Sequence, residues 1–281
     1  MANYYYLIAG LPDLRLSDAK PERSILQLKE EMDDQLSQGD RELLFYYFLR
    51  FDCENLVRLL ANPEAEIDER GNYTRDQYED LMRSARELNF NVHRYPSFIS
   101  IFAREYPYNR GKEGWFPMDA MLLAYYEFAC KCPNKMMRQW YELNLNITNI
   151  LTALIARRQG WTLSNYVQGT GEVVETILNN ANHQDFDLGN EFDYVKDLMR
   201  CAVTEDPVEK ERQIDALRWN WLEEHTFLDP FSIEALFSYI VRTELLERWA
   251  KLDVEQGRER FTQIIENLRG EARVPEEFVR R

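Results

Sequence analysis

Apolar side chains recur every three or four residues along most of the chain, which is the spacing of one face of an α-helix. Between residues 24 and 36, for example, Ile25, Leu28, Met32 and Leu36 share a face. Strictly alternating apolar and polar stretches, which are typical of half-buried strands, are rare. The chain also has only 11 Gly and 10 Pro. The pattern therefore predicts an all-α fold.

Helix start and stop signals set the limits of the predicted helices. Asp206-Pro207 has the form of a helix cap followed by a proline in the first turn, and Asp229-Pro230 repeats that form. A Pro- and Gly-rich stretch at 95–117 and a Gly-rich stretch at 160–189 interrupt the pattern. The predicted helices span residues 24–36, 41–61, 74–90, 118–130, 134–158, 172–180, 230–253 and 258–268, with another that begins at 207.

An internal repeat links two of these helices. Residues 46–57 (YYFLRFDCENLV) align without a gap on residues 140–151 (WYELNLNITNIL), at an offset of 94. Another step of 94 reaches 239–249, which has a helical, aromatic-rich pattern but lacks the Asn, so it is a possible, decayed copy. Self-similarity at a long period indicates one helical unit that is used more than once. We therefore expect three units: residues 1–95, residues 96–190 ending in the Gly-rich hinge, and a divergent third unit at 191–281.

Each copy of the repeat carries two polar side chains three residues apart, Asp52 with Asn55 and Asn146 with Asn149. Residues at this spacing share a face of a helix. A short polar side chain on an apolar helix must find a partner or face water. We interpret these four residues as structural, fixing the register of neighbouring helices by bonding to a helix terminus, rather than as a ligand site.

The repeated pattern [Asp/Asn]-x-x-Asn-[Leu/Ile]-aliphatic, in an acidic helical chain of this length, resembles the C/d family of V/A-type ATPase subunits, whose eukaryotic members are designated d. The segment 229–240 (DPFSIEALFSYI), followed by Glu244 and Glu247, is similar to the final helix of that family. Residues 4–12 (YYYLIAGLP) resemble a divergent bacterial branch that is encoded beside V-type ATPase subunits. The resemblance implies three pseudo-symmetric helical units arranged around a funnel.

The function implied by this resemblance is mechanical. Such a subunit is a non-catalytic rotor adaptor between the central stalk and the cytoplasmic face of the proteolipid ring. The resemblance therefore implies a cytoplasmic protein, peripheral to the inner membrane, with the stalk subunits and the ring as partners. The residues that it places at a partner interface are Arg157, Arg158, Tyr239, Glu244 and Glu247.

Charge and composition argue against several other classes of protein. The chain has 34 Lys and Arg against 49 Asp and Glu, a net charge of −15, whereas nucleic-acid binding needs clustered basic residues. Its 45% hydrophobic content is too high for a disordered acidic chain. No apolar run approaches the ~18 residues of a spanning helix, and the N-terminus lacks the basic region of a signal peptide. We expect neither a nucleic-acid partner nor direct membrane insertion.

Motifs that would indicate catalysis are weak. The acidic run at 30–34 lacks the DDxxD spacing of Mg²⁺-dependent terpenoid synthases, and the four cysteines and three histidines lack zinc-site spacing. We therefore expect no catalytic residue, cofactor, metal or small-molecule substrate. The alternatives are a helical-repeat scaffold that binds an unrelated protein partner in a groove, and a helical enzyme whose carboxylates or histidines converge on one pocket.

Overall fold

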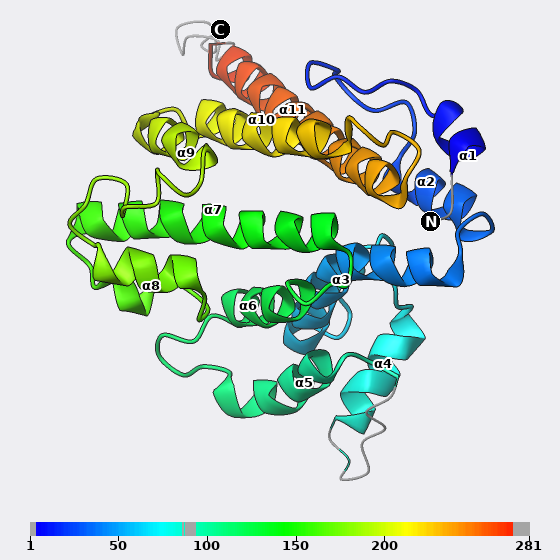
Figure 1. Cartoon of the computed structure of the whole chain (residues 1–281), viewed down its shortest axis with the longest axis horizontal. Coiled ribbons are helices and arrows are strands. Elements are labelled where there is room, and N and C mark those ends of the chain that lie inside the picture. Colours follow the sequence, from blue (N-terminus) through cyan, green and yellow to red (C-terminus); the bar gives the residue numbers. More distant parts are fainter. Residues whose placement is uncertain (1–3, 86, 88–93, 272–281) are drawn as a thin grey trace, which may run out of the picture.

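A computed structural model describes residues 4–85, 87 and 94–271 of the chain (Figure 1). Within those residues every regular element is helical and there is no strand, which confirms the all-α prediction. The elements are α1 (Tyr5–Ala9), α2 (Ile25–Asp33), α3 (Gln38–Ala61), α4 (Arg75–Ser84), α5 (Ser97–Asn109), α6 (Pro117–Ala129), α7 (Lys135–Gln159), the 3-10 helix η1 (Leu163–Asn165), α8 (Glu172–Asn179), α9 (Tyr194–Val203), α10 (Pro207–Thr226) and α11 (Ile233–Glu271).

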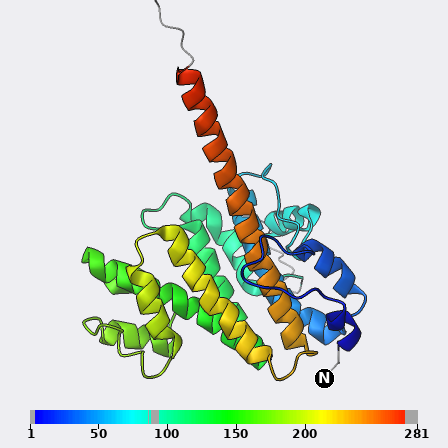
Figure 2. The same ribbon diagram turned by 90° about the horizontal axis from the view of Figure 1, so that it is seen from above.

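Helix α7 lies in the middle of the molecule, between α8 on one side and the pair α10 and α11 on the other (Figure 1). It packs against α6, α8, α9 and α11. Helix α3 packs against α5 and α6, while α10 packs against α9 and α11. Helix α11 crosses the body and extends well beyond it (Figure 2). Helices from all three predicted units therefore contribute to one contiguous core.

The two helix starts that the sequence marks with Asp-Pro differ in the structure. At α10 the side chain of Asp206 accepts a hydrogen bond from the backbone N–H of Val208 (2.9 Å), and Pro207 occupies the first turn, as predicted. At α11 the cap is Ser232, whose hydroxyl accepts from the N–H of Ala235 (3.2 Å). The prediction that this helix opens directly after Asp229 is therefore wrong by one short turn, because a serine provides a second capping side chain further on.

Helix α5 lies in the Pro- and Gly-rich stretch at 95–117 that the sequence marks as an interruption. Its buried face carries Ile99, Phe102 and Tyr106 at helical spacing. Pro96 precedes the helix, and Pro107 falls within its last turn. Pro107 lacks the N–H that would donate to the carbonyl of residue 103, but the helix ends only two residues later, so the two prolines bracket it without breaking it.

Other helix bounds also differ from the prediction, and α1 and α9 lie where no helix is predicted. Helix α4 ends at Ser84, whereas the predicted helix continues to residue 90; residues 86 and 88–90 lie outside the described part of the chain. Helix α11 continues to Glu271 through the break predicted between 253 and 258. A single glycine within a helical pattern weakens a helix by about 1 kcal/mol, which is too little to end it.

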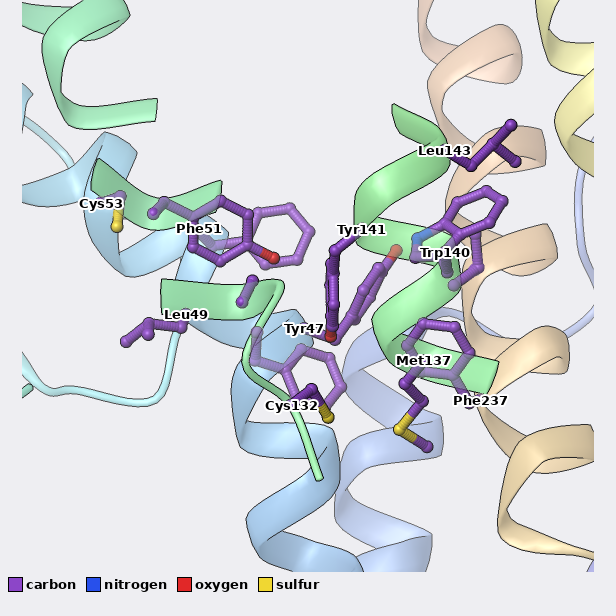
Figure 3. Close-up of a cluster of buried hydrophobic side chains, with 14 of the residues drawn as sticks. Tyr47, Leu49, Phe51, Cys53, Cys132, Met137, Trp140, Tyr141, Leu143 and Phe237 are labelled. Atoms are coloured by element: carbon purple, nitrogen blue, oxygen red, sulfur yellow. The ribbon is translucent and has the colours of Figure 1, made fainter. Parts of the chain in front are cut away.

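The core contains an aromatic cluster in which α3, α7 and α11 meet (Figure 3). The ring of Phe237 on α11, fully buried, contacts Tyr47 of α3 with centroids 5.6 Å apart. It also contacts Trp140 (6.4 Å) and Tyr141 (6.3 Å) of α7. Edge-to-face aromatic pairs contribute about 0.5–1.5 kcal/mol each beyond burial. Since Tyr47 and Tyr141 are equivalent positions of the repeat, one residue of the third segment joins both copies.

Candidate functional site

The second polar residue of the first repeat binds the backbone of the loop that follows its helix. Asn55 is fully buried; its Nδ2 donates to the carbonyl oxygen of Asp68 (2.9 Å), and its Oδ1 accepts from the N–H of Asp68 (2.7 Å). Nδ2 also lies 3.2 Å from the hydroxyl of Tyr78 on α4. One amide side chain thus pairs with both polar groups of a single residue, a contact that we call a backbone clamp.

The second repeat has the same clamp at the equivalent position. Asn149, 1% exposed, donates through Nδ2 to the carbonyl oxygen of Gln168 (2.8 Å) and accepts through Oδ1 from the N–H of Gln168 (2.8 Å). Gly169, the next residue, has a φ of +91°, a left-handed conformation that glycine adopts readily. The two copies therefore share a local structure as well as a sequence pattern, and the bonds go to loops rather than to helix termini.

The first polar residue of each pair bonds to a tyrosine hydroxyl. Asp52 accepts from the hydroxyl of Tyr78 (2.5 Å), and the Nδ2 of Asn146 donates to that of Tyr194 (3.2 Å). Asp52 also accepts from the N–H groups of residues 72 and 73. A Cβ at Gly71 would lie only 2.5 Å from Oδ1 of Asp52, so the loop needs glycine there. Burial raises the pKa of Asp52, and these hydrogen bonds offset only part of that rise.

A polar pocket of about 120 Å³ lies where α3, α6, α7, α10 and α11 meet. Its side chains come from all three predicted units and are mainly aromatic or charged. They are Tyr47, Arg50, Tyr125, Tyr126, Trp140, Tyr141, Asn144, Arg218, Val241, Glu244, Leu245 and Arg248. We call this the central pocket.

Helices α3 and α7 line the central pocket with equivalent positions of the repeat. In the first copy the lining pair is Tyr47 and Arg50, three residues apart; the equivalent pair, Tyr141 and Asn144, lines it from the second copy. On α11, lining residues with the same spacing stand at 241 and 244, which is 100 residues after 141 and 144. This offset is six residues longer than the 94-residue period, which is about 1.7 turns of helix.

Glu244 is the carboxylate of the central pocket. Its Oε1 lies 2.6 Å from the NH2 nitrogen of Arg50, and its Oε2 accepts from the hydroxyl of Tyr47 (2.9 Å). Burial alone would raise the pKa of Glu244, but the Arg50 guanidinium and the two hydrogen bonds outweigh it and hold the pKa below its usual value. The contact joins α3 to α11 through a charged pair whose side chains are 30% and 13% exposed.

Asp215 on α10 organises the other two arginines of the central pocket. It is fully buried and accepts from Arg218 (2.9 Å), from the indole N–H of Trp249 (2.9 Å) and from Arg248. Arg218 in turn donates from Nε to Oδ1 of Asn144 on α7 (2.9 Å). A buried carboxylate needs such complete pairing, because an unpaired charge in the interior costs several kcal/mol.

The residues predicted at a partner interface make internal contacts. Arg157 donates to backbone carbonyls of residues 181, 183 and 184 and lies 4.5 Å from the centre of the Phe186 ring, while Arg158 donates to the carbonyl of Ala202. Both arginines hold the segment after α7 in place. Tyr239 is only 7% exposed. Glu244 lies in the central pocket, and Glu247 accepts from the N–H of Ile25 (2.8 Å) at the start of α2.

The central pocket contains functional candidates that the sequence analysis missed. Arg50, Arg218 and Arg248 are separated by up to 198 residues, 248 minus 50, so no local spacing joins them. The repeat gives one indication of the pocket. Arg50 and Asn144 are aligned polar residues, and each lies two positions before the first polar residue of its repeat pair. An arginine aligns with an asparagine at this position. The two residues differ in charge and size, so the sequence alone does not mark the position as part of a site.

Three further properties bear on the class of site. Within the described residues, no group of three or more His, Cys, Asp or Glu is arranged to hold a metal ion. Among the same residues, no helix combines the length and the apolar character needed to cross a bilayer. The four cysteines, all of them in the described part of the chain, are free thiols.

Comparison with known proteins gives a family but not an activity. Nothing among the curated proteins or the solved structures matches the chain. One family model, described as "Protein of unknown function (DUF2764)", matches residues 1–272, which is nearly the whole chain. The chain therefore belongs to the DUF2764 family.

Proposed function

We propose that this protein is a non-catalytic rotor adaptor of a V/A-type ATPase, linking the central stalk to the membrane proteolipid ring. The observation that carries the proposal is the convergence of three chain segments on the central pocket. Two of them present equivalent repeat positions to it, and each of these two repeats bears the same backbone clamp. Repeated helical units around a central concavity are the architecture that the resemblance implies.

A subunit that transmits torque must be stiff, and polar contacts between the segments support this requirement. Arg50 of the first segment pairs with Glu244 of the third, and Asn144 of the second binds Arg218 of the third. Asn134 at the start of α7 donates to Glu234 on α11 (2.7 Å). Hydrogen bonds of this kind have fixed directions, so they resist sliding of one helix along another in a way that apolar contacts alone do not.

An adaptor also needs two separate contact regions, and the molecule has candidates at the two ends of α11. One end carries strongly exposed apolar side chains: Tyr6 (92%) on α1, with Phe227 (81%) and Leu228 (92%) in the turn before α11. A backbone hydrogen bond from Tyr4 to Phe231 (3.0 Å) holds α1 beside that turn. We call Tyr6, Phe227 and Leu228 the end patch. The other end of α11 projects from the body (Figure 2). Exposed apolar clusters of this kind mark interaction surfaces.

The chemistry of the central pocket supports a structural rather than a catalytic role. Glu244 is its lining carboxylate, and a general acid or base works best when its pKa lies near the operating pH. Pairing with Arg50 moves the pKa of Glu244 in the opposite direction. A carboxylate held as an anion by two partners is suited to joining helices rather than to exchanging protons.

The proposal is tested by affinity purification from gently detergent-solubilised membranes of the native host, with the recovered subunits identified by mass spectrometry. The tag belongs in the exposed turn at 110–114, which lies away from both ends of α11. We expect the catalytic head subunits, the central stalk and the proteolipid to be recovered together. Recovery of none of them, with the chain wholly in the soluble fraction, would contradict the proposal and leave a scaffold whose own partner appears in the same list.

A variant of the end patch sharpens the test. Phe227→Ser with Leu228→Ser removes two exposed apolar side chains without touching the core, so folding should be unchanged and part of the complex should be lost. Val203→Ser, at an equally exposed position on α9 (71%), is the matched control and should retain every subunit.

A further inference from the structure

Three arginines converge on the central pocket, and each of them also pairs with a carboxylate. Three arginines line it, Arg50, Arg218 and Arg248, against one lining carboxylate, Glu244. Asp215 contacts two of the arginines from behind, and an exposed Glu211 lies 4.0 Å from Arg248 on the outer side. In a chain with a net charge of −15, three arginines converging on one pocket are an exception.

The arginines retain hydrogen-bonding capacity after their internal bonds are made. A guanidinium carries five N–H groups. Arg50 and Arg248 each donate through NH2 alone, and Arg218 through Nε and NH1, so a terminal nitrogen of each is without a hydrogen bond among the described residues. The side chains are 30%, 38% and 18% exposed, so the pocket opens to solvent.

Buried donors beside the central pocket also lack partners. The hydroxyl of Tyr141, a pocket-lining residue only 2% exposed, makes no hydrogen bond within the described part of the chain. The Nε atoms of Arg50 and Arg248 are likewise buried and unpaired there. A buried donor without a partner costs roughly 1–3 kcal/mol in most proteins. All three atoms are shielded from solvent, so an acceptor in the central pocket reaches them only if neighbouring side chains move.

Size and donor number define the acceptor. A water molecule takes about 30 Å³ of liquid volume, so the pocket of about 120 Å³ has room for a phosphate-sized group but not for a nucleoside. Guanidinium groups bind oxyanions in pairs of parallel hydrogen bonds. Three of them offer more donors than the two oxygens of a carboxylate can accept, whereas a phosphoryl group has three or four oxygens.

We propose that the central pocket binds a phosphoryl group between Arg50, Arg218 and Arg248. The group is supplied either as free inorganic phosphate or as the terminal phosphate of a nucleotide whose remainder lies outside the pocket. Binding joins α3, α10 and α11 through one anion and so stiffens the junction of the first and third segments. This inference does not rest on the rotor-adaptor proposal, because it follows from the pocket alone.

The test is isothermal titration calorimetry of the purified full chain with sodium phosphate, against sodium chloride of equal ionic strength. We expect saturable binding of one phosphate per chain. Arg248→Met should lower the affinity at least about tenfold, since a hydrogen bond to a charged group contributes about that factor. Asp215 keeps Arg218 and Trp249 as partners in this variant, so the fold should survive. Arg200→Met, at an exposed arginine of α9 (79%), is the matched control and should bind as the wild type does.

Tyr141→Phe provides a variant that cannot fail for lack of folding, because it removes a hydroxyl with no partner. It should weaken phosphate binding severalfold while leaving the unfolding temperature unchanged or higher. A parallel titration with ATP distinguishes the source: tighter binding than phosphate identifies a nucleotide, and equal or weaker binding identifies the free anion. No heat beyond the chloride control, or phosphate affinity unchanged in both Arg248→Met and Tyr141→Phe, would overturn the proposal.

Discussion

The two backbone clamps should contribute comparably to stability, and this can be measured at each of them. Asn55→Ala removes three hydrogen bonds, two to the backbone of Asp68 and one to Tyr78. Asn149→Ala removes two, both to the backbone of Gln168. In each case a backbone N–H and a carbonyl lose a buried partner. Such groups cost about 1–3 kcal/mol when they are left unsatisfied.

The expected losses follow from how much of each loop water can reach. Asp68 and Gln168 are partly exposed, so water replaces some of the lost bonds. We expect Asn55→Ala to lower the free energy of unfolding by about 2–4 kcal/mol and Asn149→Ala by about 1–3 kcal/mol. Because the clamps share no partner, the double variant should show the sum of the two losses within about 0.5 kcal/mol.

Urea unfolding followed by tryptophan fluorescence measures these changes. Asn220→Ala, at an exposed position on α10, is the matched control and should stay within about 0.5 kcal/mol of the wild type. If both clamp variants fall within the same narrow range, the side chains do not hold the loops. The structural interpretation of the repeat would then be refuted, and a ligand or partner role for these residues would be the better explanation.

Four further outcomes are expected. Phe237→Ala should cost about 3–5 kcal/mol in the same urea assay, since it empties the aromatic cluster; a loss below about 1 kcal/mol would show that the cluster is not well packed. Glu244→Gln should lower the free energy of unfolding by about 1–3 kcal/mol at neutral pH, because it leaves Arg50 unpaired. The pKa of Glu244 lies below its ordinary 4.5, so the stability difference between wild type and variant should shrink only as the pH falls below 4.5. Burial raises the pKa of Tyr194 from 10 to about 12, so its ionisation, followed by ultraviolet absorbance, should lag behind a denatured reference, and stability should fall as the pH rises toward 12. Burial likewise raises the pKa of Cys130 to about 12, so thiol-labelling reagents should modify it far more slowly in the native protein than in urea; equal rates would contradict its burial.

The sequence was informative wherever a helix had both a cap and a continuous apolar face. Helix α7 follows the prediction to within one residue at each end, because Asn134 caps it and Gly160 ends it in a left-handed conformation. Helix α5 was missed because the prolines at its two ends outweighed its short apolar periodicity. Helix propensities give the average free-energy cost of placing a residue in a helix. The burial of three large apolar side chains on α5 stabilises the helix by more than the prolines cost.

The site was less predictable than the fold, for a physical reason. The polar repeat pairs could be found because they recur at a fixed spacing on one helix. The partners of Asn55 and Asn149 are loop backbone atoms, which carry no sequence signature, so the direction of their bonds came only from the structure. The central pocket depends on contacts between residues far apart in the chain. Its arginines lie together only because α3, α10 and α11 meet at one pocket.

The most direct test of the rotor-adaptor account is electron cryomicroscopy of the ATPase purified through a tag on this chain. We expect one copy per complex, on the rotor axis between the central stalk and the proteolipid ring, with the end patch and the projecting end of α11 in contact with different subunits. A complex in which this density is missing, or in which it lies on the stationary periphery, would contradict the account.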